Sequence, residues 1–200
     1  MAADDNPRRV VVAITGASGA VLGVRTLERL RAFDVETHLV ISAWGARTIE
    51  HETGRTVAEV RALASVVHRP GDQGATISSG SFRTDGMIIA PCSVRTLAAI
   101  ACGYADDLVT RAADVMLKER RRLVLMVREA PFSEIHLENM LKLSRMGASI
   151  VPPVLGFYTR PQTLEDVVDH VVTRALDQLG LHSDATPRWD GKVGSWRTER

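Results

Sequence analysis

The sequence predicts an α/β fold: a single-domain, doubly wound, Rossmann-like parallel sheet with helices on both faces. Short apolar runs rich in β-branched residues alternate with longer segments of helical periodicity, the pattern of parallel strands joined by crossover helices. A Gly- and Ser-rich turn directly after the first apolar run is a second indication. The length of 200 residues and the 45% hydrophobic content suit one domain with a sizeable core.

The predicted elements follow from these runs in chain order. Strands are expected at residues 10–14, 37–42, 87–90, 123–127 and 149–151. Helices are expected at residues 22–32, 43–53, 56–64, 94–101, 108–118, 135–146 and 164–179. The Gly-, Ser- and Thr-rich stretch 68–86 is expected to be a long loop, and long loops in compact domains are often functional.

The chain divides into one domain and two terminal segments. Residues 9–181 are expected to form the α/β domain, with a flexible N-terminus at 1–8. The tail 182–200 is polar but carries Trp189 and Trp196. A tryptophan in a polar tail needs an apolar partner, so we expect the tail to pack on the site or on a neighbouring subunit.

Composition and charge exclude several classes of function. A net charge of +1 gives no reason to expect nucleic acid or an anionic membrane as partner. Two cysteines favour a reducing, cytoplasmic location over a disulfide framework, and neither a signal peptide nor a run of about 18 apolar residues is present. The six histidines lack metal-ligand spacing and the cysteines do not form C-x-x-C, so no metal site is expected.

The turn at residues 15–20, TGASGA, is the strongest candidate for anion binding. Small residues at the start of a helix leave backbone N–H groups open to a phosphate, which the helix dipole favours. Ser18 is expected to cap that helix and to donate its hydroxyl to a phosphate oxygen. Because the spacing does not fit the dinucleotide pattern G-x-G-x-x-G, a mononucleotide or a flavin phosphate suits the turn better than NAD.

Two further strand ends carry polar residues. Ser93 is expected to cap the helix after strand 87–90, with Thr96 on the same side of its first turn; plain capping and anion binding explain this pair equally well. The adjacent Cys92 is better explained as a small buried thiol than as a nucleophile. Arg128 and Glu129 follow strand 123–127, where they suit phosphate binding and proton transfer; a surface ion pair is the simpler alternative.

A second, separate phosphate site is predicted from the later part of the chain. Tyr158 offers a hydroxyl and Arg174 a planar guanidinium, although Arg174 also fits an ordinary helix-face residue. Arg111 and Lys118 share one face of their helix, where they either repel each other or form an anion site.

Together these motifs resemble the UbiX flavin prenyltransferase family over roughly residues 9 to 189. The resemblance rests on GASGA, MIIAPCS (87–93), RAADV (111–115), LKERR (117–121), REAP (128–131), HLENM (136–140), GFY (156–158) and PRW (187–189). Stretches 36–42 and 77–82 resemble the branch encoded beside hydroxyarylic acid decarboxylases. Leu155 stands where relatives usually carry proline.

The resemblance implies a metal-independent transferase and a set of site residues. The enzyme would join the dimethylallyl group of dimethylallyl phosphate to N5 and C6 of reduced FMN. The product, prenylated FMN, would serve a partner UbiD-type decarboxylase, and the chain would form a homododecamer. Residues implied to meet FMN are Gly16, Ala17, Ser18, Ser42, Ser93, Val94, Arg95, Thr96 and Arg128. Those implied to bind dimethylallyl phosphate or surround it are Tyr158, Arg174, Arg111, Lys118, Ser79 and Trp189. Catalytic roles are implied for Glu129, which would exchange protons, and for Ser18, Glu52 and Lys118.

Three other functions remain open at this level. A flavin-dependent decarboxylase of peptidyl or pantothenoyl cysteine would need an active-site His and an asparagine-rich motif that we do not find. A non-catalytic FMN carrier subunit of a hydroxyarylic acid decarboxylase would not need the second anion set. A direct phenolic acid decarboxylase would have to bury an aromatic carboxylate, which paired phosphate sites do not favour.

Overall fold

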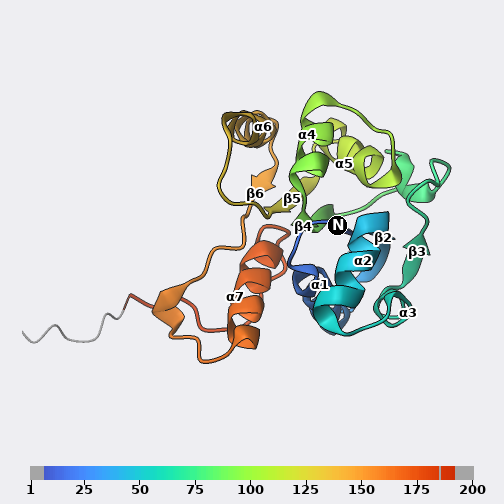
Figure 1. Ribbon diagram of the computed structural model, residues 1–200. Coiled ribbons are helices and arrows are strands. Elements are labelled where there is room, and N and C mark those ends of the chain that lie inside the picture. The colour runs from blue at the N-terminus through green and yellow to red at the C-terminus, as the bar shows by residue number, and fades with distance from the viewer. Residues whose placement is uncertain (1–6, 185, 192–200) are drawn as a thin grey trace, which may run out of the picture.

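The computed structural model describes residues 7–184 and 186–191 and contains a six-stranded parallel sheet (Figure 1). The strand order is β3-β2-β1-β4-β5-β6, and every neighbouring pair is parallel. The strands are β1 (Arg9–Ile14), β2 (Glu36–Ile41), β3 (Val66–His68), β4 (Gly86–Cys92), β5 (Arg122–Val127) and β6 (Ser149–Ile150). This order is that of the doubly wound Rossmann fold, so the predicted fold class is confirmed.

Helices cover both faces of the sheet (Figure 1). They are α1 (Ala20–Ala32), α2 (Ala43–Thr53), α3 (Val57–Arg61), α4 (Val94–Cys102), α5 (Leu108–Lys118), α6 (Glu134–Arg145) and α7 (Leu164–Asp177), with short 3-10 helices η1 (Thr76–Ser78) and η2 (Phe157–Thr159). All seven predicted helices are present within one to three residues at each end. Helices follow β1, β2, β4 and β5, so the chain crosses from one parallel strand to the next through helical connections.

Two hydrophobic cores explain why the strand sequences are apolar throughout. Val10, Val12 and Ile14 of β1 point to a core shared with α1, α2, α3 and α7. Val11 and Ala13 of the same strand point to the opposite core, shared with α4, α5 and α6. A strand buried on both faces has no polar side, which is why its sequence reads as a continuous apolar run.

Strand β3 and the 3-10 helix η1 were not predicted from the sequence. The edge strand β3 lies where a long loop was expected to begin, and it pairs with β2 through residues 66–68. Val66 and Val67 are both exposed, so this strand has neither the alternation nor the burial that marks a strand in a sequence. The rest of the predicted loop includes η1.

Both terminal predictions fall partly outside the described residues. The expected flexible segment 1–8 is described only at positions 7 and 8, where the Arg8 guanidinium donates to the Gly180 carbonyl at 3.2 Å. In the tail, Trp189 packs against Tyr158 with ring centroids 5.7 Å apart, whereas Trp196 lies outside the described part.

The strand order reverses at β1: β2 and β3 extend the sheet on one side of it, and β4, β5 and β6 extend it on the other, so the switch point lies between β1 and β4. Beyond the carboxyl ends of such strands, doubly wound folds have a crevice where ligands bind. The two neighbouring loops begin at Thr15 and Ser93.

Candidate functional site

A cavity of about 680 Å³ opens at this switch point, within the size range of small-molecule sites. We call it the switch-point pocket. It is lined by Thr15, Gly16, Ala17, Ser18, Ser42, Ala43, Trp44, Pro70, Ser93, Val94, Arg95, Thr96, Ala99, Tyr104, Asp106, Asp107, Thr110, Arg128 and Glu129. The lining therefore includes all nine residues expected to meet a flavin, together with Glu129.

The two loops are fixed to each other by Thr15. Its hydroxyl donates to the Pro91 carbonyl at 2.7 Å and accepts from the Ser93 backbone N–H at 2.9 Å. Thr15 is buried, so both bonds are shielded from water. The sequence alone does not distinguish Thr15 from the rest of the TGASGA turn, because it joins the two loops only when the ends of β1 and β4 lie side by side.

Ser93 caps α4 as predicted. Its hydroxyl accepts from the Thr96 backbone N–H at 3.2 Å and lies 3.0 Å from the Thr96 hydroxyl. Both side chains line the pocket, so capping and anion binding are compatible explanations of this pair.

The predicted cap of α1 is wrong. The N-cap is Gly19, at a positive φ of 102°. Glycine has no side chain, so the N-cap residue itself makes no capping hydrogen bond. The carboxylate of Glu52, on α2, takes this place and accepts from the N–H groups of Gly19 and Ala20, both at 2.8 Å. These two N–H groups are therefore not open to a phosphate, and Ser18 lies in the pocket instead of capping.

Glu52 is held as a carboxylate by its surroundings. Partial burial acts to raise its pKa, but the N–H groups of Ala20 and Gly19, the Ser18 hydroxyl and the charge of Arg128 outweigh it and lower the pKa. Glu52 does not line the pocket itself. It shapes the pocket by fixing the start of α1 and the Ser18 hydroxyl.

Close packing holds the β1 turn against α2. Ser42 caps α2 by accepting from the Gly45 N–H at 3.0 Å. A Cβ at Gly16 would overlap the Cβ of Trp44, so this turn tolerates no side chain without a shift. Trp44 is 60% exposed and presents its ring to the mouth of the pocket, with the Arg47 guanidinium 4.9 Å from the ring centroid.

Arg128 and Glu129 both reach the pocket from the end of β5, which favours the site interpretation over a surface ion pair. The Glu129 carboxylate accepts from the Ala130 N–H at 3.0 Å. Cys92, by contrast, is fully buried, and that burial raises the pKa of its thiol to about 12, as expected for a packing residue.

Four further residues that line the pocket were not predicted from the sequence. Tyr104, Asp106 and Asp107 come from the turn between α4 and α5, and Pro70 comes from the loop after β3. Asp107 also caps α5, accepting from the Thr110 N–H at 2.8 Å. The D-D-x-x-T pattern after Gly103 was a detectable capping signal, but its location beside the pocket was not.

Three of the expected substrate residues form a separate group beside η1. The Arg111 Nε donates to the Ser78 carbonyl at 3.0 Å, next to Ser79, and its Nη1 pairs with Asp114 at 2.8 Å. Lys118 pairs with Glu119. Arg111 and Lys118 are thus neutralised by neighbouring carboxylates on the same chain, and neither they nor Ser79 lines the pocket.

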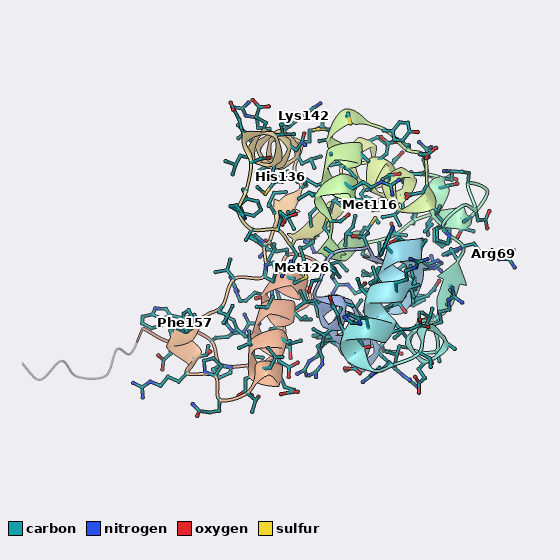
Figure 2. All side chains as sticks on the ribbon, viewed as in Figure 1. Arg69, Met116, Met126, His136, Lys142 and Phe157 are labelled. Atoms are coloured by element: carbon teal, nitrogen blue, oxygen red, sulfur yellow. The ribbon has the colours of Figure 1, made fainter. Side chains whose placement is uncertain are left out.

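Tyr158 on η2, Arg174 on α7 and Trp189 in the tail form a third group. Tyr158 packs edge-on against His170 at 5.5 Å and against Trp189 at 5.7 Å between ring centroids. Arg174 pairs with Asp177 at 2.6 Å. In Figure 1 the chain leaves β6 and runs out to η2, and in Figure 2 Phe157 lies well away from the buried residues Met116 and Met126. Within one chain this group does not meet the switch-point pocket.

In the part of the chain that the structure describes, no three His, Cys, Asp or Glu side chains gather in the way that would hold a metal ion. Among the same residues, no helix is both long and apolar enough to cross a membrane.

Comparisons with known proteins identify this arrangement. The family model described as Flavoprotein matches residues 2–176. A probable UbiX-like flavin prenyltransferase of Streptomyces sp. (strain D7) is 65% identical over 92% of each chain. The chain belongs to the UbiX flavin prenyltransferase family. It is thus an enzyme of the flavin prenyltransferase class, and the expected family resemblance is confirmed.

Solved structures of UbiX proteins share the whole architecture. AnUbiX in complex with FMN and dimethylallyl pyrophosphate superposes with a TM-score of 0.93 at 55% identity, covering 94% of this chain and 100% of that one. A dodecameric FMN-dependent UbiX-like decarboxylase from Escherichia coli O157:H7 has a TM-score of 0.90 at 59% identity, covering 92% and 100%.

The switch-point pocket has the chemistry that FMN requires. The hydroxyls of Ser42, Ser93 and Thr96 and the guanidinium of Arg128 suit a phosphate monoester, and Trp44 and Tyr104 provide aromatic surface for a flat ring.

Proposed function

We propose that this UbiX-family enzyme transfers the dimethylallyl group of dimethylallyl phosphate to N5 and C6 of reduced FMN, and that its switch-point pocket holds the flavin. The single observation that carries the proposal is the convergence of Ser18, Ser42, Ser93, Thr96 and Arg128 on one 680 Å³ cavity that also contains Glu129. FMN, when bound, supplies the electron-rich ring that accepts the allyl group.

The residues of the pocket have distinct proposed roles. The hydroxyls of Ser42, Ser93 and Thr96 hold the FMN phosphate. Arg128, together with Tyr158 and Arg174 of a neighbouring copy, binds the phosphate of the allyl donor through fixed donors, and so stabilises that phosphate as it departs when the allylic C–O bond breaks. Glu129 takes the proton that C6 releases and delivers it to the departing phosphate. Trp44 and Trp189 face the allyl group while it carries cationic character. Glu52 and Ser18 hold the start of α1, and with it the position of the flavin tail.

The site is proposed to be completed by neighbouring copies of the chain. Tyr158, Arg174 and Trp189 do not meet the pocket of their own chain, and neither do Ser79, Arg111 and Lys118. The outer segments carry exposed apolar side chains, among them Phe157 at 76% and Val154 at 70%, which association would bury. The dodecameric E. coli structure supports assembly as the route, and we propose a homododecamer here.

Two further parts of the proposal concern cellular context. The product, prenylated FMN, is proposed to serve a UbiD-type decarboxylase as functional partner. A cytoplasmic location is proposed because neither Cys92 nor Cys102 forms a disulfide, which suits a reducing compartment.

An anaerobic reaction tests the function directly. The purified protein is mixed with reduced FMN and dimethylallyl phosphate, and the mass and absorbance of the flavin are recorded. The expected product is a flavin that has gained one five-carbon unit. An unchanged flavin mass with folded, FMN-bound protein would instead identify a flavin carrier.

A further inference from the structure

The Asp177 carboxylate, at the end of α7, pairs with two arginines and one histidine beside Tyr158. It accepts hydrogen bonds from Arg174 Nη1 at 2.6 Å, from Arg188 Nη1 and Nη2 at 3.0 and 2.9 Å, and from His182 Nδ1 at 3.0 Å. We call these four residues the Asp177 cluster. The Asp177 side chain is only 7% exposed, whereas those of Arg174 and Arg188 are 53% and 37% exposed. The anion partner is thus inside and the guanidinium groups face outward.

Asp177 keeps its negative charge at any pH near neutrality. Burial acts to raise its pKa, but hydrogen bonds from Arg188 and His182 and the charges of Arg188 and Arg174 outweigh burial and lower the pKa to about 2. Asp177 therefore cancels one of the two guanidinium charges of the cluster. Asp184 lies outside the cluster, 4.0 Å from Arg188 Nε, and its carboxylate is fully exposed to solvent, which screens its charge. The cluster presents a net charge of +1 to a ligand.

The tail places Arg188 beside Tyr158. Trp189, the next residue, packs edge-on against the Tyr158 ring, with 5.7 Å between the ring centroids. Arg188 also donates to the Ser183 carbonyl at 2.9 Å, and its Nε lies 4.0 Å from the Asp184 carboxylate, so groups on both sides orient its guanidinium. A ligand oxygen at Tyr158 and Arg174 would meet a second guanidinium, with Asp177 behind both.

We propose that Asp177 is a positioning and charge-setting residue of this anion site and makes it favour an allylic monophosphate over the corresponding diphosphate. The inference rests on the proposed function, in which Tyr158 and Arg174 bind the phosphate of the allyl donor. A diphosphate brings about one more negative charge than a monophosphate. Its additional stabilisation depends on the net positive charge of the site, which Asp177 halves from +2 to +1. Asp177 also orients the two arginines, but this affects both ligands equally. The ratio of their affinities therefore reports only the effect of charge.

Calorimetric titration of the protein loaded with oxidised FMN tests this without turnover. Dissociation constants are measured for dimethylallyl monophosphate and diphosphate. In Asp177→Asn, the affinity ratio of diphosphate to monophosphate is expected to rise about threefold, the effect of one unit charge about 6 Å away at the dielectric constant of water. Asp177→Glu, which keeps the charge, is expected to retain the wild-type ratio.

Two other variants keep the test valid even if Asp177→Asn fails to fold. Arg188→Gln removes a positive charge from the exposed side and is expected to shift the ratio about threefold in the opposite direction. Asp169→Asn is the matched control, because Asp169 lies on the same helix and also pairs with two arginines, Arg25 and Arg29, but outside the cluster. Its ratio is expected to match the wild type.

The measured affinity ratios test the role of Asp177 separately from prenyl transfer itself. An unchanged ratio in both Asp177→Asn and Arg188→Gln overturns the role of Asp177 while leaving the prenyl transfer intact. A shift in Asp169→Asn as large as that in Asp177→Asn also overturns it, because the effect would then be a general one of net charge. Wild-type protein that binds neither phosphate and leaves FMN unmodified would refute both proposals.

Discussion

A methyl group added at Gly16 is expected to weaken FMN binding selectively. The Cβ of Gly16→Ala would overlap the Cβ of Trp44, which lies in the first turn of α2. Both residues line the switch-point pocket, so any relief of the overlap changes the pocket itself. Either Trp44 swings outward or the β1 turn moves away from α2.

The size of the effect follows from the packing. Real Cβ atoms essentially never approach within 3.0 Å, and optimal carbon contacts lie at about 3.5–4.0 Å, so the two segments must separate by at least about 0.5 Å. Overpacking of this kind costs about 1–3 kcal/mol. If that energy is recovered by moving the flavin-binding turn, the dissociation constant for FMN rises about 5- to 150-fold.

Titration of flavin fluorescence measures the change. The matched control is Gly71→Ala, because a Cβ at Gly71 meets nothing within 4 Å, and its FMN affinity is expected to equal that of the wild type. Thermal unfolding of the unliganded variants separates lost binding from lost folding. Wild-type affinity in Gly16→Ala would show that this turn does not touch the flavin, and the cradle would have to be sought elsewhere.

The remaining predictions concern the proton carrier, the shared site and pH. Glu129→Gln is expected to keep FMN affinity but to slow prenyl transfer at least about tenfold, as measured by flavin mass in timed anaerobic samples; normal turnover would remove this carboxylate from the mechanism. Arg128→Gln and Arg174→Gln are each expected to be inactive, but co-expression should restore part of the activity, because mixed oligomers combine an intact pocket with an intact partner group; no recovery would argue for a site within one chain. Burial, followed by repulsion from His38, lowers the pKa of His68, with Asp72 opposing them. Its contribution to stability is thus complete above about pH 6.5 and is lost as the pH falls toward the lowered value, so urea unfolding from pH 8 to 5 should show a smaller loss in His68→Gln than in the wild type. Identical pH profiles would refute this assignment.

The sequence was informative wherever a local pattern has one physical meaning. Apolar β-branched runs fixed the positions of β1, β2, β4 and β5, because strands buried on both faces admit little else. Ser93 was identifiable as a helix cap from its own neighbours. Edge strand β3 was not identifiable, since Val66 and Val67 are exposed and the strand is held by pairing with β2 alone.

Capping of α1 shows where local reasoning failed. Ser18 has the right chemistry but lies one residue before the N-cap, Gly19, and Glu52, from a different helix, occupies the N–H groups of Gly19 and Ala20. A charged carboxylate accepts stronger hydrogen bonds than a hydroxyl, and only the packing of α1 beside α2 brings it there.

The amino-acid sequence by itself determined the doubly wound class, the family and most of the pocket, since turns and caps at strand ends are short-range features. Only the tertiary structure decided which of these residues share a space. It separated Tyr158, Arg174 and Trp189 from Arg128 and Glu129, and it surrounded Asp177 with cations drawn from α7 and the tail. The physical reason is that distances between residues remote in the chain depend on how helices pack on the sheet, and no local pattern records them.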